Sequence, residues 1–448
     1  MSKSPKIEKP ALAALVSTDH TGNSAENTQL LQRRKAHLGG SALFYREPLQ
    51  IVRGEGVWLF DEQGRQYLDC YNNVACVGHC HPRVTNALCT QARLLNTHTR
   101  YLHEEVVKYT ERLANSFPDK LEVCFLVCTG SEANELAMRI ARSVTGKQGA
   151  IVMENAYHGN TILINEMSTC FSAPNQRPSY IAAVEPPNTY RGPFGPGEDA
   201  GGQYAGLVDA AIAKLQGNGE GVAAFMCDMI FDSQGTLEAP VDYFHRVYAS
   251  VRAAGGLCIA DEVQSGLGRT GDLWGFEHYG VVPDIVTLGK PMGAGHPLAA
   301  VITSRDIAEQ FARSNVYFNT FGGNPVSAAV GNAVLDVIED ENILANVQDV
   351  GTYLRAGLEG LATRSPAIGN IRGRGLFLGV ELVKDRASKT PDSLKAVRIA
   401  EQMREEGILV GATGRYGNVI KFRPPLIFSR DNADLFLRVL DRLLVADA

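Results

Sequence analysis

The stretch DIVTLGKPMGAGHPLAAVITS (284–304) contains two short apolar runs on either side of a turn rich in glycine and proline. The first run ends at a single lysine, Lys290. Apolar runs of this length, in which polar residues do not alternate, predict strands that are buried on both faces. The stretch therefore predicts two strands of a buried sheet, with Lys290 at the end of the first.

Runs of the same character precede this stretch: EVCFLVC (122–128), GAIVMEN (149–155), VAAFMCDM (222–229) and GLCIADE (256–262). Longer amphipathic segments, which predict helices, lie between them. Strands that alternate with helices predict an α/β fold with a mostly parallel central sheet flanked by helices. The segment 190–203 is rich in Gly and Pro and predicts a surface loop.

The two ends of the chain have a different pattern. Residues 57–69, VWLFDEQGRQYLD, predict a hairpin with its turn at 62–64. The C-terminal part predicts two amphipathic helices and further short strands. We expect both ends to form a smaller α+β domain, from residues 28–90 and 341–448, beside a large domain of residues 91–340.

Composition limits the partners and the location of the protein. The 448 residues carry a net charge of −6 with both signs interspersed, which argues against nucleic acid or an anionic membrane as a partner. No run of about 18 apolar residues occurs, so no membrane span is expected. Nine cysteines at irregular spacing predict reduced, buried thiols in a cytoplasmic protein. Residues 1–27 include a short ALAALV run, too short for a secretory signal, and predict a flexible N-terminal arm.

The motif TGSEANELAMRIARS (129–143) places Gly130 and Ser131 between a predicted strand and a predicted helix. Gly130 lets the backbone approach an anion, and Ser131 adds a hydroxyl to the free N–H groups of the helix N-terminus. This arrangement favours phosphate binding. The alternative is an ordinary helix start, with Ser131 as N-cap and a glutamate nearby.

The motif GLCIADEVQSGLGRTG (256–271) places Asp261 and Glu262 at the carboxyl end of a buried strand, where open α/β sheets bind ligands. A buried carboxylate needs a cationic or hydrogen-bonding partner, and a protonated pyridine nitrogen would supply one. A metal is the weaker alternative, because no histidine cluster or third carboxylate lies in register. A structural role for the acidic pair stays open.

Taken together and in this order, these features predict one cofactor site. A phosphate turn, then an acid, then Lys290 at a strand end is the set that a pyridoxal 5'-phosphate (PLP) site requires: a phosphate cradle, a pyridinium partner and a Schiff-base lysine. Taken alone, Lys290 could be a surface lysine at a strand end. Since a lysine that leaves a buried strand is costly unless it is used, the combination favours the PLP site.

TGSEAN, YHG (157–159), DEVQSGLGRTG, the lysine and FNTFGGNP (318–325) together resemble the class III (ω-type) aminotransferases, which are fold-type I PLP enzymes. The resemblance covers the chain from about residue 30 to the C-terminus. It implies that Lys290 forms the Schiff base and moves the proton, and that Asp261 pairs with the pyridinium nitrogen.

The same resemblance implies the remaining cofactor contacts. Gln264 would contact the ring hydroxyl, and Tyr157 would stack on the ring with His158 behind it. Gly130 and Ser131 would hold the phosphate. Thr320 would reach the cofactor phosphate of the neighbouring subunit, which implies a homodimer with shared active sites.

Three segments bear on the reaction. Typical members carry an arginine that grips a substrate carboxylate in a pattern like IIRFAPPL, whereas this chain reads NVIKFRPPL (418–426), with Lys421 at the arginine position and Arg423 in place of a small residue. Ser233, in CDMIFDSQG, stands where dual-substrate members have a glutamate that gates that arginine. Asn72 and Asn73 stand where many members have apolar or aromatic pocket residues. Lysine does not reproduce bidentate carboxylate binding, so a changed substrate is expected.

These segments, with RYLH (100–103) and LVKDRASKTP (382–391), look most like the ethanolamine-phosphate and phosphohydroxylysine phospho-lyases. The implied reaction converts O-phosphoethanolamine and water into acetaldehyde, ammonia and phosphate. A leaving phosphate needs cationic or donor groups, and the candidates are Asn72, Asn73, Lys421 and Arg423. The period of two in a strand puts Lys421 and Arg423 on the same face, where they could also be solvated or paired with an acid.

Two other functions stay open. The first is a class III aminotransferase that passes an amino group from an ω-amine or amino acid to a keto acid such as pyruvate or glyoxylate. The second is a PLP-binding regulator without catalysis, against which the intact Lys290, Asp261, Gln264 and Thr320 argue. His79 and His81 in GHCHP are a weak metal pattern, and no metal is predicted.

Overall fold

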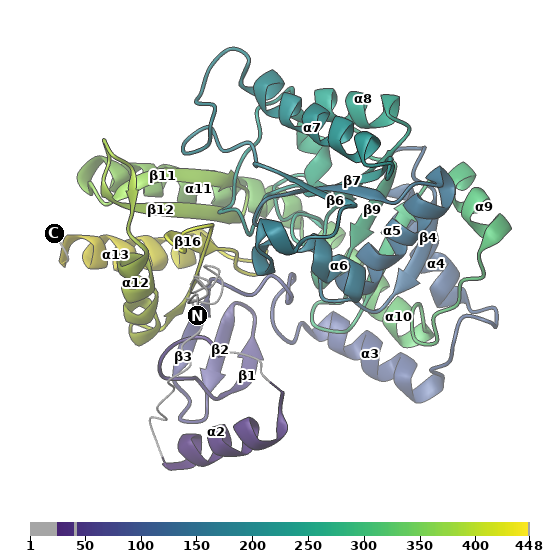
Figure 1. Ribbon diagram of the computed structural model, residues 1–448. Helices are drawn as coiled ribbons and strands as arrows, with labels where there is room; N and C mark the ends of the chain where they lie inside the picture. The colour runs from purple at the N-terminus through teal and green to yellow at the C-terminus, as the bar shows by residue number, and fades with distance from the viewer. Residues whose placement is uncertain (1–24, 40–42, 447–448) are drawn as a thin grey trace.

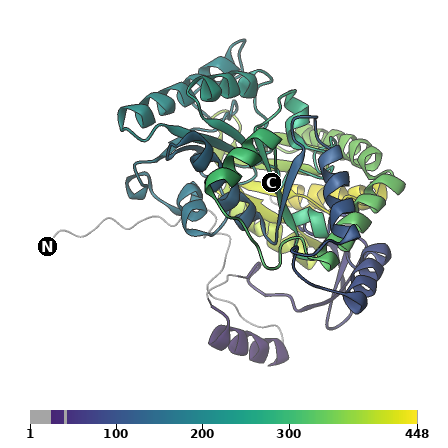
Figure 2. The same cartoon turned by 90° about the vertical axis from the view of Figure 1, so that its right-hand side faces the viewer.

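The structure, a computed structural model, describes residues 25–39 and 43–446. The predicted arm of residues 1–27 lies outside the described residues except for its last three, which begin helix α2 (Ala25–His37). In Figures 1 and 2 α2 stands away from the body of the molecule. No helix of the described residues is long and apolar enough to cross a membrane.

The largest sheet has seven strands in the order β4-β10-β9-β8-β7-β5-β6. Only β10 runs antiparallel to its neighbours, so the prediction of a mostly parallel sheet is confirmed. All six predicted runs form strands, while β6 was missed because its apolar part has only four residues. The strands are β4 (Val123–Val127), β5 (Gly149–Met153), β6 (Ile181–Val184), β7 (Val222–Asp228), β8 (Leu257–Asp261), β9 (Ile285–Leu288) and β10 (Ala299–Thr303).

Helices cover both faces of this sheet (Figure 1). Successive side chains of a strand point to opposite faces of the sheet, so β10 contributes to both layers. Ala299 and Val301 pack in one apolar cluster, and Ala300 and Ile302 pack in the other. The first cluster includes side chains of α5 (Gly130–Thr145), α6 (Ile162–Met167) and α9 (Arg305–Ser314). The second includes those of α3 (Pro82–Leu94), α4 (Glu104–Asn115), α7 (Ala200–Gly217), α8 (Tyr243–Ala253) and α10 (Pro325–Asp340). Short 3₁₀ helices are η1 (Thr169–Phe171), η2 (Pro174–Gln176), η3 (Gly275–Tyr279) and η4 (Lys290–Gly293).

The two chain ends meet in a small sheet. β2 (Trp58–Asp61) and β3 (Gln66–Asp69) form the predicted hairpin, and Gly64 in its turn has a φ of +81° that glycine tolerates. β1 (Ile51–Glu55) pairs with β2, and β14 (Ile408–Leu409) from the C-terminal part pairs in parallel with β3.

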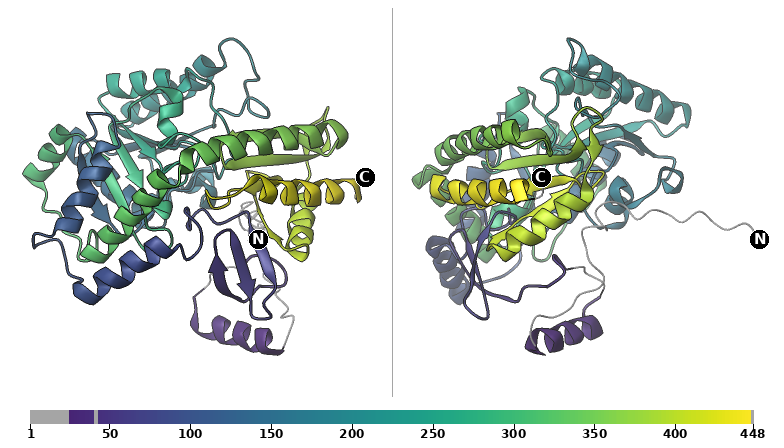
Figure 3. Two further views of the ribbon diagram at one scale, coloured as in Figure 1. Left: turned by 180° about the vertical axis from the view of Figure 1, so that it is seen from behind. Right: turned by 90° about the vertical axis from the view of Figure 1, so that its left-hand side faces the viewer.

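A second sheet of the C-terminal part has the order β11-β12-β16-β15, with β13 beside β12. These strands are β11 (Ile368–Arg374), β12 (Phe377–Asp385), β13 (Thr390–Pro391), β15 (Gly411–Thr413) and β16 (Val419–Phe422). Figure 3 shows α11 and α13 side by side along this sheet. The expectation of two helices here is wrong, because there are three: α11 (Ile343–Arg364), α12 (Ser393–Glu405) and α13 (Arg430–Ala446). The domain limits stay a prediction, and position 90 falls inside α3.

Candidate active site

The carboxyl ends of β7, β8 and β9 bring the predicted acid and lysine to one edge of the large sheet. Asp228 of β7 lies opposite Asp261 of β8, and Asp261 lies opposite Thr287 of β9. Lys290 follows β9 by two residues. This edge is where open α/β sheets bind their ligands.

Asp261 is nearly fully buried and holds a fixed set of partners. One oxygen, Oδ2, lies 2.8 Å from His158 Nδ1 and accepts a hydrogen bond of 2.9 Å from Asn134 Nδ2. The other accepts the N–H of Val263. Asn134 also donates to the carbonyl of His158. Asn134 is a site residue that the sequence motifs did not single out, although a polar residue on the buried face of a predicted helix was its signal.

The start of α5 lies next to this acid. Its N-cap is Thr129, which forms a capping box with Glu132, so Ser131 is not the cap that the alternative interpretation required. Ser131 lies in the first turn, and its Oγ accepts the N–H of Asn160. The capping box leaves the N–H groups of Gly130 and Ser131 to point out of the helix end, where they favour an anion.

Gly130 is needed at this place for a steric reason. A Cβ on Gly130 would lie 3.0 Å from both methyl groups of Val263, and one on Gly289 would lie 3.2 Å from the Cα of Gly130. The helix start therefore packs against the residues that precede Lys290. A phosphate at this helix end would lie in the same site as Lys290 and Asp261.

Tyr157 and His158 differ in exposure. His158 is buried, and its Nε2 has no partner. Tyr157 is 37% exposed and meets Phe171 edge to face at 5.6 Å. A ring with one open face is what stacking on a planar cofactor requires.

The predicted substrate residues form a second group, the cation cluster, defined as Lys421, Arg423 and the carboxylate between them. Lys421 Nζ lies 3.0 Å from Asp232 Oδ1, and Arg423 Nη1 lies 3.5 Å from Asp232 Oδ2. All three side chains are buried. Lys421 and Arg423 thus share one face of β16 and its extension, as the period of two predicts.

Gln264 connects the cation cluster to Asn73. Its Nε2 donates to Asp232 Oδ2 at 2.8 Å. Its Oε1 accepts from Arg423 Nη1 at 2.7 Å and from Asn73 Nδ2 at 2.5 Å. The structure therefore brings Asn73, Gln264, Lys421 and Arg423 into one network.

Tyr71 covers the cation cluster and was missed in the sequence. The guanidinium of Arg423 lies 4.6 Å from the centre of the Tyr71 ring, and Lys421 Nζ lies 5.5 Å from it. A Cβ at Gly411 would come within 2.4 Å of the ring, so the chain needs glycine there. Tyr71 directly precedes the two asparagines that the sequence singled out.

Two predicted residues are placed apart from these groups. The N–H of Asn72 donates to Asp69 Oδ1, and no hydrogen bond among the described residues joins its side chain to the cation cluster. Thr320 lies exposed on the segment between α9 and α10. A partner subunit could reach Thr320, but the single chain does not bring it to the site.

The acid near Lys421 does not come from the gating position. By the family resemblance Ser233 stands at that position, so the gating glutamate itself is missing. In the structure Asp232, one residue earlier, supplies a carboxylate to Lys421. The alternative that Lys421 and Arg423 pair with an acid is therefore the one that the structure shows, because the turn after β7 directs the side chain of Asp232 toward β16.

Burial and neighbouring charges shift the titration of the site. Burial and the Arg423 guanidinium lower the pKa of Lys290, against the opposing effect of nearby carboxylates. Burial opposes ionisation of Asp232, but Lys421 and Arg423 outweigh it, so that its pKa is lowered. Asp232 is therefore an anion at neutral pH.

Two further buried acids, Asp228 and Glu262, have raised pKa values. Burial, together with the charges of Asp261 and Asp232, raises the pKa of Asp228 to about 8. Burial raises the pKa of Glu262 to about 7. Glu262 accepts hydrogen bonds from Ser265 Oγ and two backbone N–H groups of η3. The two neighbouring acids therefore have different roles. Asp261 faces the site, and Glu262 stabilises the backbone of η3.

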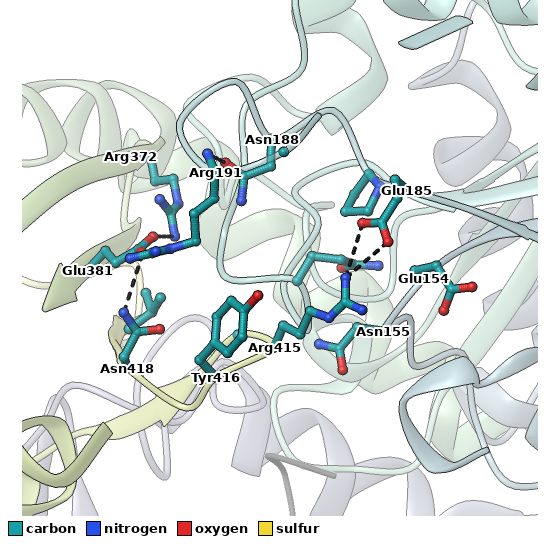
Figure 4. A pocket seen from close by; sticks show the side chains of 15 residues that line it. Glu154, Asn155, Glu185, Asn188, Arg191, Arg372, Glu381, Arg415, Tyr416 and Asn418 are labelled. Carbon is teal, nitrogen blue, oxygen red and sulfur yellow. Dashed lines mark hydrogen bonds and ion pairs between the residues drawn. The ribbon is translucent and has the colours of Figure 1, made fainter. Parts of the chain in front are cut away.

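A polar cavity lies beside the site, between the ends of β5 and β6 and the hairpin of β15 and β16 (Figure 4). Its charges are paired: Arg372 and Arg191 with Glu381, and Arg415 with Glu185. Asn155 lines the cavity, and its Nδ2 donates a hydrogen bond to the carbonyl of Ser233, the residue after Asp232. The paired charges make this cavity a junction between the large sheet and the C-terminal part.

The weak metal pattern is used for structure. His79 lies 2.7 Å from Asp69, and His81 lies 3.1 Å from Glu341. No group of three metal-ligating side chains occurs among the described residues. All nine cysteines are unpaired, but Cys80 and Cys89 are exposed, so the expectation of buried thiols is wrong for these two.

Comparison with known proteins adds to this geometry. Residues 44–444 match the family model of the class III aminotransferases. The chain belongs to the class III aminotransferase family. An alanine–glyoxylate aminotransferase 2-like protein of Drosophila melanogaster is 44% identical, over 92% of this chain and 85% of that protein. An ethanolamine-phosphate phospho-lyase homolog of Caenorhabditis elegans is 36% identical, over 97% and 96%.

A solved structure of a phospholyase from Arthrobacter, in complex with phosphoethanolamine, is also similar to this chain. It is 45% identical with a TM-score of 0.89, over 93% of this chain and 99% of that chain. The fold-type I architecture and PLP as cofactor follow for this member of the family. Because other relatives are named as mitochondrial proteins, the cytoplasmic location stays a prediction.

The residues present fit this cofactor. A buried carboxylate, Asp261, is held by His158 and Asn134 at one end of the site, and a helix start with Gly130 and Ser131 lies at the other. The Nε2 of His158 and the Oδ1 of Asn134 are buried polar atoms without partners. The assignments of individual residues to cofactor atoms stay predictions.

Proposed function

We propose that this class III family member is a phospho-lyase that eliminates phosphate from O-phosphoethanolamine or a related phosphorylated amine. The observation that carries the proposal is the cation cluster. Lys421 and Arg423 are buried and lie on one face, and Arg423 is close enough to Lys290 to lower its pKa. By the family resemblance, members that bind a substrate carboxylate have an arginine at the position of Lys421. The similarity to a phospholyase that binds phosphoethanolamine supports the same function.

The chemistry of a leaving phosphate explains this arrangement. Negative charge develops on the phosphate as its bond to carbon breaks, and preorganised cations in a site shielded from water stabilise it. Lys421 supplies a point charge, and Arg423 supplies directed donors. Tyr71 lies over both cations and limits the access of water to them.

The remaining residues have the following roles in the proposal. PLP, when bound, supplies an electron sink for the carbon that carries the substrate nitrogen. Lys290 would hold the cofactor covalently, and as a free amine, which its lowered pKa favours, it would take the proton from that carbon. Asp261 stabilises a proton on the cofactor nitrogen. With one water consumed, O-phosphoethanolamine gives acetaldehyde, ammonia and phosphate.

We also propose a homodimer in which Thr320 of each subunit serves the other's site. The segment around Thr320 carries exposed apolar side chains, among them Val316, Phe318 and Phe321. Tyr101 and Leu102 are exposed as well, and Arg100 stacks on Phe318. Such a patch is typical of a surface that another chain covers. Sedimentation of the double variant Phe318→Glu, Phe321→Glu should give a monomer, and a dimer would contradict this surface.

An aminotransferase is the second candidate, and the similarity to alanine–glyoxylate aminotransferase 2-like proteins favours it. In that case Lys421 and Arg423 would bind a carboxylate. A transaminase requires a keto acid for turnover, whereas a lyase does not.

This difference defines the test. Holoenzyme is mixed with excess O-phosphoethanolamine without a keto acid, and free phosphate and the cofactor absorbance are followed. Phosphate released over many turnovers, with the cofactor spectrum unchanged, is expected. Consumption of one equivalent of amine without phosphate, with conversion of the cofactor to its amine form, would show a transaminase instead.

A further inference from the structure

Asp232 lies between the two cations that, in the proposed function, would bind the substrate phosphate. Both of its oxygens lie near Lys421 Nζ, at 3.0 and 3.3 Å, and Oδ2 also contacts Arg423. Asp232 is only 4% exposed. The two cations that would hold a phosphate are therefore already paired.

The charges of the cation cluster are unequal. Lys421 and Arg423 carry two positive charges, and Asp232 carries one negative charge. A phosphate monoester carries between one and a half and two negative charges at neutral pH, by the usual value of about 6 for its second pKa. Two anions in one buried site repel each other strongly. A phosphate on both cations and the Asp232 carboxylate therefore exclude each other.

The rest of Asp232 is fixed, so only its side chain needs to turn. Its N–H donates to Asp228 Oδ2 at 2.8 Å, and its carbonyl accepts from Thr413 Oγ1 at 3.0 Å. Gln264 Nε2 also donates a hydrogen bond to Oδ2, at 2.8 Å. A carboxylate tethered in this way stays at high effective concentration next to the cations.

We propose that Asp232 is an internal competitor of phosphate, an inference that rests on the proposed phospho-lyase function. Asp232 holds Lys421 and Arg423 in the free enzyme and yields them to the substrate phosphate. After the bond to carbon breaks, it takes the cations back and so expels inorganic phosphate.

This device also gives specificity. A substrate carboxylate carries one negative charge, as Asp232 does, so it binds the two cations no more strongly than Asp232. A phosphate dianion carries two negative charges and binds the two cations more strongly. An internal competitor that occupies the site most of the time lowers apparent affinity by the fraction of time that the site is free. It therefore rejects carboxylates more strongly than phosphates.

The test uses holoenzyme and inorganic phosphate as the probe. Asp232→Asn should bind phosphate about tenfold tighter or more, measured as inhibition and as the rise in melting temperature that phosphate produces. Its KM for O-phosphoethanolamine should fall, and its kcat should fall because phosphate leaves slowly. Asp232→Glu, which keeps the charge, should restore weak phosphate binding. Asp349→Asn removes an exposed carboxylate elsewhere and should change neither value.

Unchanged or weaker phosphate binding in Asp232→Asn would overturn the proposal. If that variant does not fold, Asp232→Ser takes its place, and wild-type enzyme is compared with sulfate and acetate. Sulfate should inhibit and acetate should not, and equal inhibition would overturn the proposal. The binding measurements do not depend on lyase turnover, so a wild type that releases no phosphate from O-phosphoethanolamine refutes the proposed function separately.

Discussion

Lys290 and Lys421 show how the surroundings of a residue decide its chemistry. Both are lysines at the end of a strand or within one. Lys290 has a lowered pKa because burial and Arg423 disfavour its charge. Lys421 keeps a carboxylate, Asp232, within 3.0 Å. The first lysine is suited to covalent and proton-transfer work, and the second to holding an anion.

Lys290→Ala should abolish turnover and the absorbance of the covalently held cofactor, because the turn after β9 contains no second lysine. Absorbance and phosphate release by purified protein measure both effects. Lys384→Ala, at an exposed lysine, should match wild type. Activity retained in Lys290→Ala would refute the assignment of the site.

Lys421→Ala should raise the KM for the phosphorylated amine by about 10- to 100-fold, since truncating one partner of a buried charge pair costs about 2–5 kcal/mol, part of it as lost stability. The cofactor absorbance should stay intact. Steady-state kinetics measure KM, and Lys421→Arg should recover part of the loss. An unchanged KM would remove Lys421 from the pocket.

The helices and strands place most site residues at or near their ends. Helix α5 points its first turn at the end of β8, and its capping box fixes where that turn begins. Strand β16 carries Lys421, and the segment after it carries Arg423. The turn after β7 then places Asp232 between these cations. Two segments that are distant in sequence, the turn after β7 and β16 with its extension, therefore build the cation cluster.

Thr129→Ala should lower the free energy of unfolding by about 1 kcal/mol, because it removes the N-cap hydrogen bond to Glu132. It should also weaken cofactor binding, since Gly130 and Ser131 follow directly. Chemical denaturation and cofactor titration measure the two effects. Thr129→Ser keeps a hydroxyl and should restore both, and full stability in Thr129→Ala would contradict the role of the cap.

At the scale of the whole molecule, the large sheet meets the C-terminal part through buried ion pairs. Glu381 of β12 pairs with Arg372 of β11 and with Arg191, which lies in the segment after β6 (Figure 4). Burial opposes the charge of Glu381, but the two arginines outweigh it and lower its pKa. This junction positions β16 and hence Lys421 relative to Lys290.

Glu381→Gln should lower the free energy of unfolding by about 3–5 kcal/mol near pH 7, because it leaves two buried arginines without their carboxylate. The lowered pKa of Glu381 means that its contribution is present above the usual value of about 4.5 and is lost as the pH falls through the lowered pKa. The difference from wild type should therefore shrink toward pH 3. Denaturation at both pH values measures it, and a constant difference would refute the pairing.

The sequence alone predicted every strand of the large sheet except β6. It also singled out Lys290, Asp261, Gly130 and Ser131 as site residues, whose roles stay predictions. Each of these depends on a local pattern: an apolar run, a turn with glycine, or a polar residue at a strand end. The class III family resemblance rested on the same local motifs, and the family comparison confirmed it.

Tertiary structure alone decided the partners of these residues. Asp232 and Lys421 are 189 positions apart, and Tyr71 and Arg423 are 352 positions apart. Asn134 was placed on Asp261 by the packing of α5 against the sheet. No local pattern encodes such contacts, because they form only when distant segments share one buried space in which each charge must find a counter-charge.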